Sequence, residues 1–141
     1  MKYLLDTCVI SELIKTKPNS NVVNWIKKNN EQDYFLSSLT LGEIHKGIEK
    51  LSDKSRKNKL HQWVEHDLME RFKNRIIPID FNIAKIWGQI QGRAELDGKP
   101  MPAIDSLIAA TGLFYDLIVV TRNIFDMQQS QVVLLNPWEL E

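Results

Sequence analysis

The sequence predicts an α/β fold: a three-layer sandwich in which helices cover both faces of a central, mostly parallel sheet of four to five strands. Short apolar segments alternate with longer segments whose apolar residues recur at three- and four-residue intervals, as strands and helices do in parallel sheets. The first segment, Tyr3–Leu5, is apolar throughout, which is typical of a strand buried on both faces. At 141 residues, 43% of them hydrophobic, the chain is expected to form a single domain over residues 1–141.

Each predicted element follows from its residue spacing. The strands are the short apolar or aromatic segments, in chain order Tyr3–Leu5, Tyr34–Leu36, Arg75–Ile79, Leu117–Val120 and Val132–Leu135. The helices are the segments with helical spacing, in chain order Val9–Ile14, Ser20–Ile26, Ile44–Leu51, Asp53–Arg71, Phe81–Leu96 and Ala103–Thr111. Pro78 places its strand at a sheet edge or a strand end, because proline cannot donate a ladder hydrogen bond.

Capping and turn residues set the expected helix boundaries. The first helix is expected to open near Ser11 and to end at the turn Lys17–Ser20, whose last residue caps the next helix. Ser37–Glu43 is expected to be a loop that enters the third helix. Asp97 and Gly98 supply the stop after Leu96.

Four carboxylates fall where predicted elements meet. Asp6 ends the first strand, Glu43 starts the helix after the second, Asp105 lies in the first turns of an apolar helix, and Asp126 lies in the loop after the fourth strand. In a parallel sheet, the carboxyl ends of the strands and the amino ends of the following helices share one edge. We therefore expect the four side chains to converge there.

Each carboxylate also has a structural interpretation. Thr40–Glu43 fits the capping box, in which the glutamate only satisfies amide donors of its own helix. Asp105 fits a partner of the helix dipole, and Asp126 fits a local turn. Asp6 is the hardest to explain in this way, because a carboxylate that follows a buried strand needs a partner and only Lys2 is near in sequence.

Several carboxylates in one pocket require a cation or protons, since two unit charges about 4 Å apart repel by roughly 4 kcal/mol at an effective dielectric of 20. Oxygen ligands favour hard ions such as Mg²⁺ or Mn²⁺. Such sites bind phosphate oxygens and activate water, so phosphodiester hydrolysis is the leading chemical hypothesis.

Charge is unevenly distributed along the chain, although the formal net charge is +0. Residues 46–59 contain six basic and two acidic side chains, a net charge of +4, and residues 101–141 have a net charge of −4. The basic segment is either a surface for a polyanion or a solvated helix face. The candidates for RNA contact are Lys46, Lys50, Lys54, Arg56 and Lys57.

Four motifs, in order, resemble the PIN-domain ribonucleases, and in particular the toxins of type II toxin–antitoxin pairs of the VapC and FitB kind. The motifs are Leu4–Leu13, Ser38–Ile48, Asp105–Ala110 and Val120–Asn123, and the final Asn136–Trp138 resembles the C-terminal end of FitB-like members. The resemblance covers almost the whole chain and implies the PIN-like form of the three-layer sandwich.

The resemblance also implies roles for residues and partners. Asp6, Glu43 and Asp105 are the implied catalytic metal ligands, for Mg²⁺ or Mn²⁺, and the hydroxyls of Thr7 and Thr121 are implied to support them. The substrate is implied to be RNA, such as a tRNA, cut by metal-activated water. The implied partners are a second copy of the chain and an antitoxin with a DNA-binding domain.

The sequence departs from the family pattern at two positions. Cys8 stands where the family usually has asparagine, and a thiol does not offer the hydrogen bonds of an amide. Asn123 stands where FitB-like members have aspartate directly after Thr-Arg. The fourth metal ligand is therefore expected to be either Asn123 or Asp126.

Two other functions fit parts of the pattern. One is a PIN-like module that binds RNA or protein without cutting it. The other is a haloacid-dehalogenase-like phosphotransferase, which also has a strand that ends in aspartate but needs a second aspartate where Cys8 stands. Trp25, Trp63 and Trp87 are expected in the core or an interface, and the histidines at 45, 61 and 66 have no zinc-like spacing.

The cellular location is expected to be the cytoplasm. The chain has one cysteine and therefore no internal disulfide, and its N-terminus lacks the apolar stretch of a secretory signal. No segment has the length and hydrophobicity of a membrane span, so no membrane association is expected.

Overall fold

A computed structural model describes residues 1–140 and contains one five-stranded, fully parallel sheet. The strands are β1 (Tyr3–Leu5), β2 (Tyr34–Ser37), β3 (Ile76–Ile77), β4 (Ile118–Val120) and β5 (Leu134–Leu135). Their order across the sheet is β3-β2-β1-β4-β5, so β1 lies at the centre. The predicted α/β fold with a parallel sheet is confirmed.

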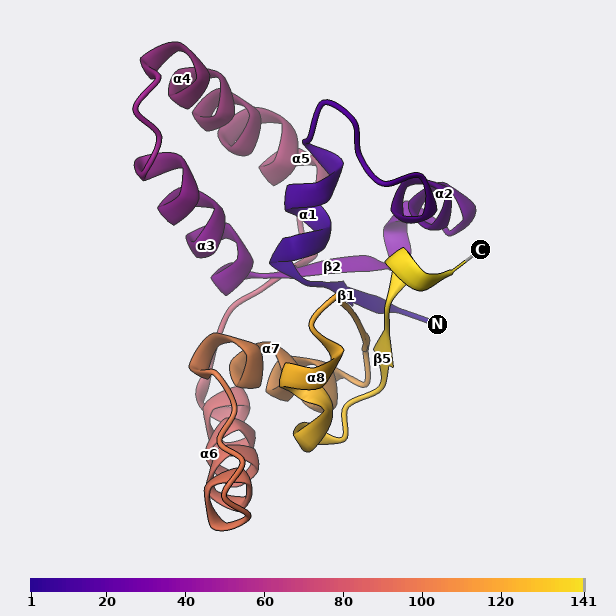
Figure 1. Cartoon of the computed structure of the whole chain (residues 1–141), viewed down its shortest axis with the longest axis vertical. Helices are drawn as coiled ribbons and strands as arrows, with labels where there is room; N and C mark the ends of the chain where they lie inside the picture. The colour runs from indigo at the N-terminus through magenta and orange to yellow at the C-terminus, as the bar shows by residue number, and fades with distance from the viewer. Residues whose placement is uncertain (141) are drawn as a thin grey trace.

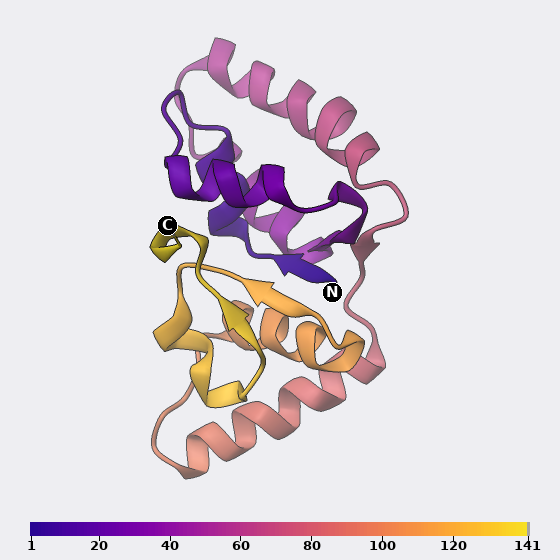
Figure 2. The same ribbon diagram turned by 90° about the vertical axis from the view of Figure 1, so that its right-hand side faces the viewer.

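Helices cover both faces of this sheet (Figures 1 and 2). One layer contains α1 (Thr7–Leu13), α2 (Ser20–Lys28), α3 (Ser38–Glu49), α4 (Lys54–Gln62) and α5 (Met69–Arg71). The other contains α6 (Phe81–Leu96), α7 (Ala103–Tyr115) and α8 (Ile124–Met127). A π-helical turn, η2 (Trp63–Leu68), joins α4 to α5, and short 3-10 turns span η1 (Glu31–Asp33), η3 (Gln128–Ser130) and η4 (Pro137–Glu139).

The two faces of β1 belong to different hydrophobic clusters. Tyr3 and Leu5 pack with α1 to α4, and Leu4 packs with α6, α7 and α8. Leu4 and Leu5 are essentially inaccessible to solvent. The alternation follows from the two-residue period of a strand, and it confirms that this segment is buried on both faces.

The strand register fixes the residues at the carboxyl edge of the sheet. Leu5 pairs with Val120, and the backbone N–H of Asp6 donates to the carbonyl of Val120 at 2.9 Å. The backbone N–H of Thr121 donates in turn to the carbonyl of Leu135 at 2.9 Å. Asp6 and Thr121, which are 115 residues apart in sequence, are therefore neighbours.

Several predicted boundaries were wrong at helix starts. The first helix begins at Thr7 with Asp6 as its N-cap, rather than near Ser11, and the second is capped by Asn19 instead of Ser20. α3 begins at Ser38, so the segment expected as a loop is helical. In each case a strand or turn passes into the helix through a capping side chain, leaving no loop between the elements.

The remaining elements agree more closely with the sequence. The helix Phe81–Leu96 was predicted with its observed bounds, and β3 lies at the sheet edge, followed directly by Pro78. Asp126 was expected in a loop but lies in the short helix α8. Among residues 1–140, no helix is both long and apolar enough to cross a membrane.

Candidate functional site

Asp6 is a buried carboxylate at the carboxyl end of the central strand, with 3% of its surface exposed. One oxygen, Oδ1, accepts the backbone N–H of Thr7 at 2.8 Å, which caps α1. The other, Oδ2, accepts the hydroxyl of Thr121 at 2.8 Å. All of these donors are neutral, so the negative charge of Asp6 is hydrogen-bonded but not compensated.

The pKa of Asp6 is raised by its surroundings. Burial is the largest cause, because it penalises the charged form, and the nearby charge of Glu43 adds to it. The hydrogen bonds from Thr121 and Thr7 oppose the shift without cancelling it. Within the described residues, no Lys, Arg or His forms an ion pair with Asp6.

Thr7 connects Asp6 to Glu43 on the neighbouring helix. Its hydroxyl oxygen lies 2.5 Å from Oε1 of Glu43, to which it donates, and 3.3 Å from the hydroxyl of Thr40. Glu43 lies in the second turn of α3, whose N-cap is Ser37. The capping-box interpretation of Glu43 is therefore wrong, and its side chain instead faces the start of α1.

Asp105 lies in the first turn of α7 and is half-buried. Its pKa is raised to about 6, first by burial and then by the charges of Asp6, Asp126 and Glu43. Asp105 thus lies close enough to the other three carboxylates predicted to converge for their charges to act on it. In Figure 1, the starts of α1, α3 and α7 lie at the same edge of the sheet.

The loop after β4 completes this edge. The hydroxyl of Thr121, which donates to Asp6, also accepts the backbone N–H of Asn123 at 2.9 Å. Asn123 is half-buried, and Asp126 is exposed one helical turn further on. Asp126 contributes charge to the site through its effect on Asp105.

Cys8 lies directly against this arrangement. Its Sγ is 3.7 Å from Oδ2 of Asp6 and 3.6 Å from the hydroxyl oxygen of Thr121, and it accepts the backbone N–H of Arg122 at 3.5 Å. Burial and the charge of Asp6 raise the pKa of the thiol to about 11, so it is protonated at neutral pH. The thiol occupies a polar position but offers only weak hydrogen bonds.

The donor set fits a hard divalent cation. No group of three or more His, Cys, Asp or Glu side chains in residues 1–140 is arranged so that it could hold a metal ion. Mg²⁺ does not require such a group, because it keeps several waters and binds through one or two carboxylates. Asp6 is buried and has no ion pair with a side chain of residues 1–140, and Asp105 lies near the other three carboxylates, so the site supplies only oxygen ligands and an excess of negative charge.

The predicted basic residues lie at the far end of α3 and the start of α4. Lys46, Lys50, Lys54 and Arg56 are exposed, whereas Lys57 is half-buried and pairs with Glu49 at 3.6 Å. The distance from Glu43 to Lys50 along the helix is about 10 Å, at 1.5 Å per residue. The basic group is therefore adjacent to the carboxylates but separate from them.

Sequence analysis overlooked three side chains near the carboxylates. Glu12 is buried at the end of α1, and Arg122 lies over the ring of Trp138 with 5.0 Å between Cζ and the ring centroid. Arg122 was visible in the sequence as the one basic residue after position 101. Its contact with Trp138 depends on the fold and had no signal in the sequence.

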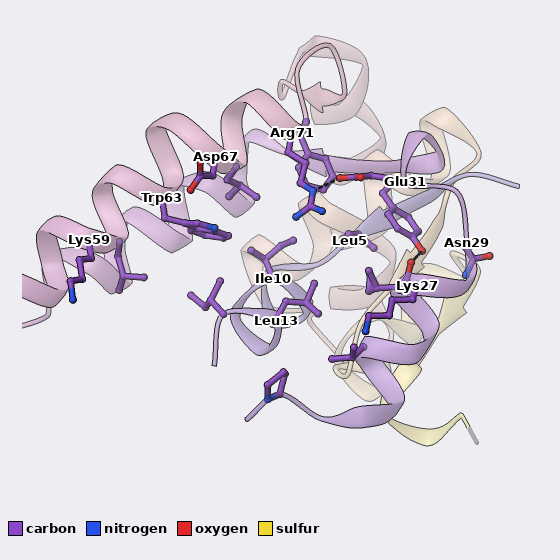
Figure 3. A pocket seen from close by; sticks show the side chains of 18 residues that line it. Leu5, Ile10, Leu13, Lys27, Asn29, Glu31, Lys59, Trp63, Asp67 and Arg71 are labelled. Carbon is purple, nitrogen blue, oxygen red and sulfur yellow. Dashed lines mark hydrogen bonds and ion pairs between the residues drawn. The ribbon is translucent and has the colours of Figure 1, made fainter. Parts of the chain in front are cut away.

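A cavity of about 880 Å³ lies elsewhere, between α1, α2 and the α4–η2–α5 segment. Figure 3 shows Ile10, Leu13 and Trp63 pointing into it, with Lys59 at one end and the Arg71–Glu31 ion pair at the other. The cavity lining is mostly apolar, and the four carboxylates do not contribute to it. We call it the apolar cleft.

Comparison with known proteins gives consistent matches over nearly the whole chain. Residues 3–124 match the PIN domain family. The toxin FitB of Neisseria gonorrhoeae is 38% identical over 96% of this chain and 97% of its own length, and the tRNA(fMet)-specific endonuclease VapC of Shigella flexneri is 31% identical over 98% of both. The crystal structure of FitAcB from Neisseria gonorrhoeae superposes with a TM-score of 0.94 at 38% identity, covering 98% of this chain and 99% of that one.

Proposed function

The chain belongs to the PIN domain family, and we propose that it is a metal-dependent endoribonuclease that acts as the toxin of a type II toxin–antitoxin pair. The observation that carries this proposal is the uncompensated negative charge at the carboxyl edge of the sheet. Asp6 is buried without a cation, and Asp105 has a pKa of about 6 because of its burial and its acidic neighbours. Carboxylates clustered in this way are costly for the folded state unless a cation or protons neutralise their charge.

Asp6, Glu43 and Asp105 would hold Mg²⁺ or Mn²⁺, directly or through water, with Asn123 or Asp126 as the fourth ligand. When bound, such an ion activates water and stabilises charge on a phosphodiester. The protein's own contribution is orientation. Thr121 and the backbone N–H of Thr7 fix the two oxygens of Asp6, and the Thr7 hydroxyl fixes Glu43.

The test is cleavage of total tRNA and of single-stranded RNA by the purified protein in Mg²⁺ or Mn²⁺. Asp105→Asn should reduce cleavage by about 100-fold or more, since a ligand charge is lost, and chelation by EDTA should abolish it. Asp116→Asn is the matched control, because Asp116 is exposed at the other end of the same helix in a left-handed conformation that asparagine accepts. Cleavage by Asp105→Asn at the rate of the control would overturn the proposal.

The exposed basic residues Lys46, Lys50, Lys54 and Arg56 are proposed to hold the RNA backbone beside the site, together with Lys57. Their charges would attract a polyanion that the carboxylates repel. Each lost phosphate contact should reduce the slope of binding against salt by about 0.7 for single-stranded RNA. An unchanged slope in a variant that neutralises all five would show that they are solvated surface.

An antitoxin with a DNA-binding domain is the proposed protein partner. The neighbouring structures include FitAB bound to a DNA fragment, at 37% identity and a TM-score of 0.93. The apolar cleft, of about 880 Å³, offers room for side chains of such a partner. Trp63→Asp should weaken the complex formed with the product of the adjacent reading frame, and unchanged co-purification would exclude the cleft.

The proposal includes a homodimer in the cytoplasm. Sedimentation of the purified chain tests the dimer, and a monomer at all accessible concentrations would contradict it.

The favoured alternative to catalysis is a PIN-like module that binds RNA or protein without cutting it, which predicts RNA binding with no cleavage in either metal. The phosphotransferase alternative lacks its second aspartate, because Cys8 occupies that position.

A further inference from the structure

The backbone of Arg122 lies at the edge of the acidic site, and the charge of its side chain acts on Glu12. Arg122 is the one Lys or Arg in residues 101–141, and it directly follows Thr121, whose hydroxyl donates to Asp6. Its backbone N–H donates to Sγ of Cys8, which also touches Asp6. The backbone of Arg122 is thus fixed on both sides next to the buried carboxylate.

The side chain of Arg122 is exposed and is not used in an ion pair within residues 1–140. It is near enough to Glu12 to help lower the pKa of that carboxylate, although it is the smallest of the contributing causes. Glu12 already has Lys15 at 2.9 Å and the backbone N–H of Asn19 at 2.9 Å. Charge compensation of Glu12 therefore does not require Arg122.

Trp138 holds the guanidinium in place. Cζ of Arg122 lies 5.0 Å from the centroid of the tryptophan ring, within the range of a cation–π contact. The tryptophan is itself fixed, because its backbone N–H donates to Asn136 Oδ1 and its carbonyl accepts the amide of Asn21, both at 3.0 Å. Its ring also packs against the core layer formed with α1 to α4.

A guanidinium above an aromatic ring keeps its N–H donors free at its edges. These donors match the oxygens of a phosphate, with which arginine forms paired, charge-assisted hydrogen bonds. The need for such a contact is electrostatic, since an RNA phosphate that approaches Asp6, Glu43, Asp105 and Asp126 meets repulsion from each of them. Arg122 supplies a local attraction at that edge.

We infer that Arg122, supported by Trp138, binds a phosphate of the RNA backbone beside the carboxylates. The inference rests on the proposed ribonuclease function and adds to it a phosphate-binding residue separate from the basic group on α3 and α4. Trp138 is a positioning residue in this arrangement, because it acts through Arg122.

The experiment measures binding of a fluorescein-labelled oligouridylate by anisotropy, in EDTA so that cleavage does not interfere, over a series of NaCl concentrations. Arg122→Ala should weaken binding by about ten-fold, the equivalent of one charge-assisted hydrogen-bonding group, and should lower the salt slope by about 0.7. Arg93→Ala is the matched control, since Arg93 is exposed on α6 in the opposite layer. It should leave both the affinity and the slope unchanged.

Variants of Trp138 test the positioning role. Trp138→Phe keeps an aromatic face and should bind within about two-fold of the wild type, whereas Trp138→Leu should weaken binding in the same direction as Arg122→Ala. In the Arg122→Ala background, Trp138→Leu should have no further effect on binding. A full additional loss in that background would show that the tryptophan does not act through Arg122.

The outcomes separate this inference from the proposed function. If the wild type cleaves RNA in Mg²⁺ while Arg122→Ala keeps the affinity and salt slope of Arg93→Ala, the inference is wrong and the ribonuclease proposal stands. If the wild type neither binds nor cleaves RNA, both are wrong. Thermal melting of every variant identifies losses of binding that come from unfolding.

Discussion

Helix α1 has a buried carboxylate at each end, and the two have opposite electrostatic surroundings. Asp6, at the N-terminal end, has only neutral donors around it, and burial together with the charge of Glu43 raises its pKa. Glu12, at the C-terminal end, accepts hydrogen bonds from Lys15 and from the backbone N–H of Asn19, which lower its pKa. Both residues are little exposed, at 3% and 6%, but burial is the largest influence on the pKa of Asp6 and only the third largest on that of Glu12.

This difference distinguishes a carboxylate that has charged partners within the chain from one that has none, as the proposed metal site requires. The helix dipole alone would favour an anion at Asp6 and disfavour one at Glu12, yet the pKa shifts have the opposite signs. At Asp6, burial and the charge of Glu43 outweigh the dipole, whereas at Glu12 the hydrogen bonds from Lys15 and Asn19 outweigh it. The charge of Glu12 is compensated by Lys15, whereas the charge of Asp6 is not compensated by any ion pair within residues 1–140.

The largest expected effect on stability comes from Glu12→Ala. This change removes the acceptor of the Asn19 N–H and should lower the free energy of unfolding by about 2 kcal/mol, or roughly 8 °C in Tm, because a hydrogen bond to a charged group contributes about 1.5–3 kcal/mol. Lys15 adds little, since its side chain is 59% exposed. Thermal and urea melting measure the loss, with Glu95→Ala on the exposed surface of α6 as control. If Glu12→Ala and Glu95→Ala are equally stable, Glu12 does not stabilise the fold, and the contrast with Asp6 is wrong.

Asp6→Asn should raise the free energy of unfolding in metal-free buffer, the opposite of the effect of Glu12→Ala. Asparagine keeps the shape, accepts the Thr7 N–H as a good N-cap, and removes the uncompensated charge, so the Tm should rise by about 4 °C, the equivalent of ~1 kcal/mol. Saturating Mg²⁺ should raise the Tm of the wild type and leave this variant unchanged. A fall in Tm without metal would mean that the carboxylate of Asp6 already stabilises the fold.

The pH dependence of stability should also differ between Asp105, at the start of α7, and Glu12, at the C-terminal end of α1. The pKa of Asp105 is about 6 in the folded chain against 3.8 for an ordinary aspartate, so the folded state binds the extra proton between these values. Its contribution is favourable at low pH and is lost as the pH rises through about 6. For Glu12, whose pKa is lowered, the stabilisation is present at neutral pH and is lost as the pH falls.

Metal-free melting curves from pH 4 to pH 8 measure this effect. Relative to Asp105→Asn, the wild type should lose roughly 1 kcal/mol as the pH rises from about 4 to about 6, a value reduced from the full shift because Asp105 is half-exposed to solvent. Mg²⁺ affinity, measured by calorimetry, should fall as the pH decreases below 6, since the ligand must lose its proton. Parallel curves for the two proteins would contradict the raised pKa.

The sequence was sufficient to predict the architecture because strand and helix periodicity are local properties. The run Tyr3–Leu5 and the helix Phe81–Leu96 have clear patterns of two and of three to four residues, and both were predicted with their observed bounds. Helix starts were harder to predict. Asp6 and Ser37 each end a strand and cap the next helix, and a pattern of apolar residues does not mark that transition.

The candidate site shows the same division between local and long-range information. The shared edge of a parallel sheet was enough to predict that Asp6, Glu43 and Asp105 lie near one another, and their roles as metal ligands stay a prediction. The Thr7–Glu43 and Arg122–Trp138 contacts join segments far apart in sequence. They depend on the positions of side chains on different elements, which a single sequence does not specify.

The smallest expected effect concerns Cys8, a neutral neighbour whose thiol is only a weak hydrogen-bond donor to Asp6. An asparagine in its place would offer amide donors to Oδ2 of Asp6, where the thiol is 3.7 Å away. Better donors stabilise the charged form of Asp6, so Cys8→Asn should raise the metal-free Tm by about 2 °C, the equivalent of ~0.5 kcal/mol. The stabilisation that Asp6→Asn gives should then be smaller in the Cys8→Asn protein than in the wild type. Cys8→Ala, which removes the thiol without adding a donor, is the control for packing. A double-mutant cycle with Asp6→Asn gives the coupling directly, and a coupling of zero would show that residue 8 affects the fold without acting on the carboxylate.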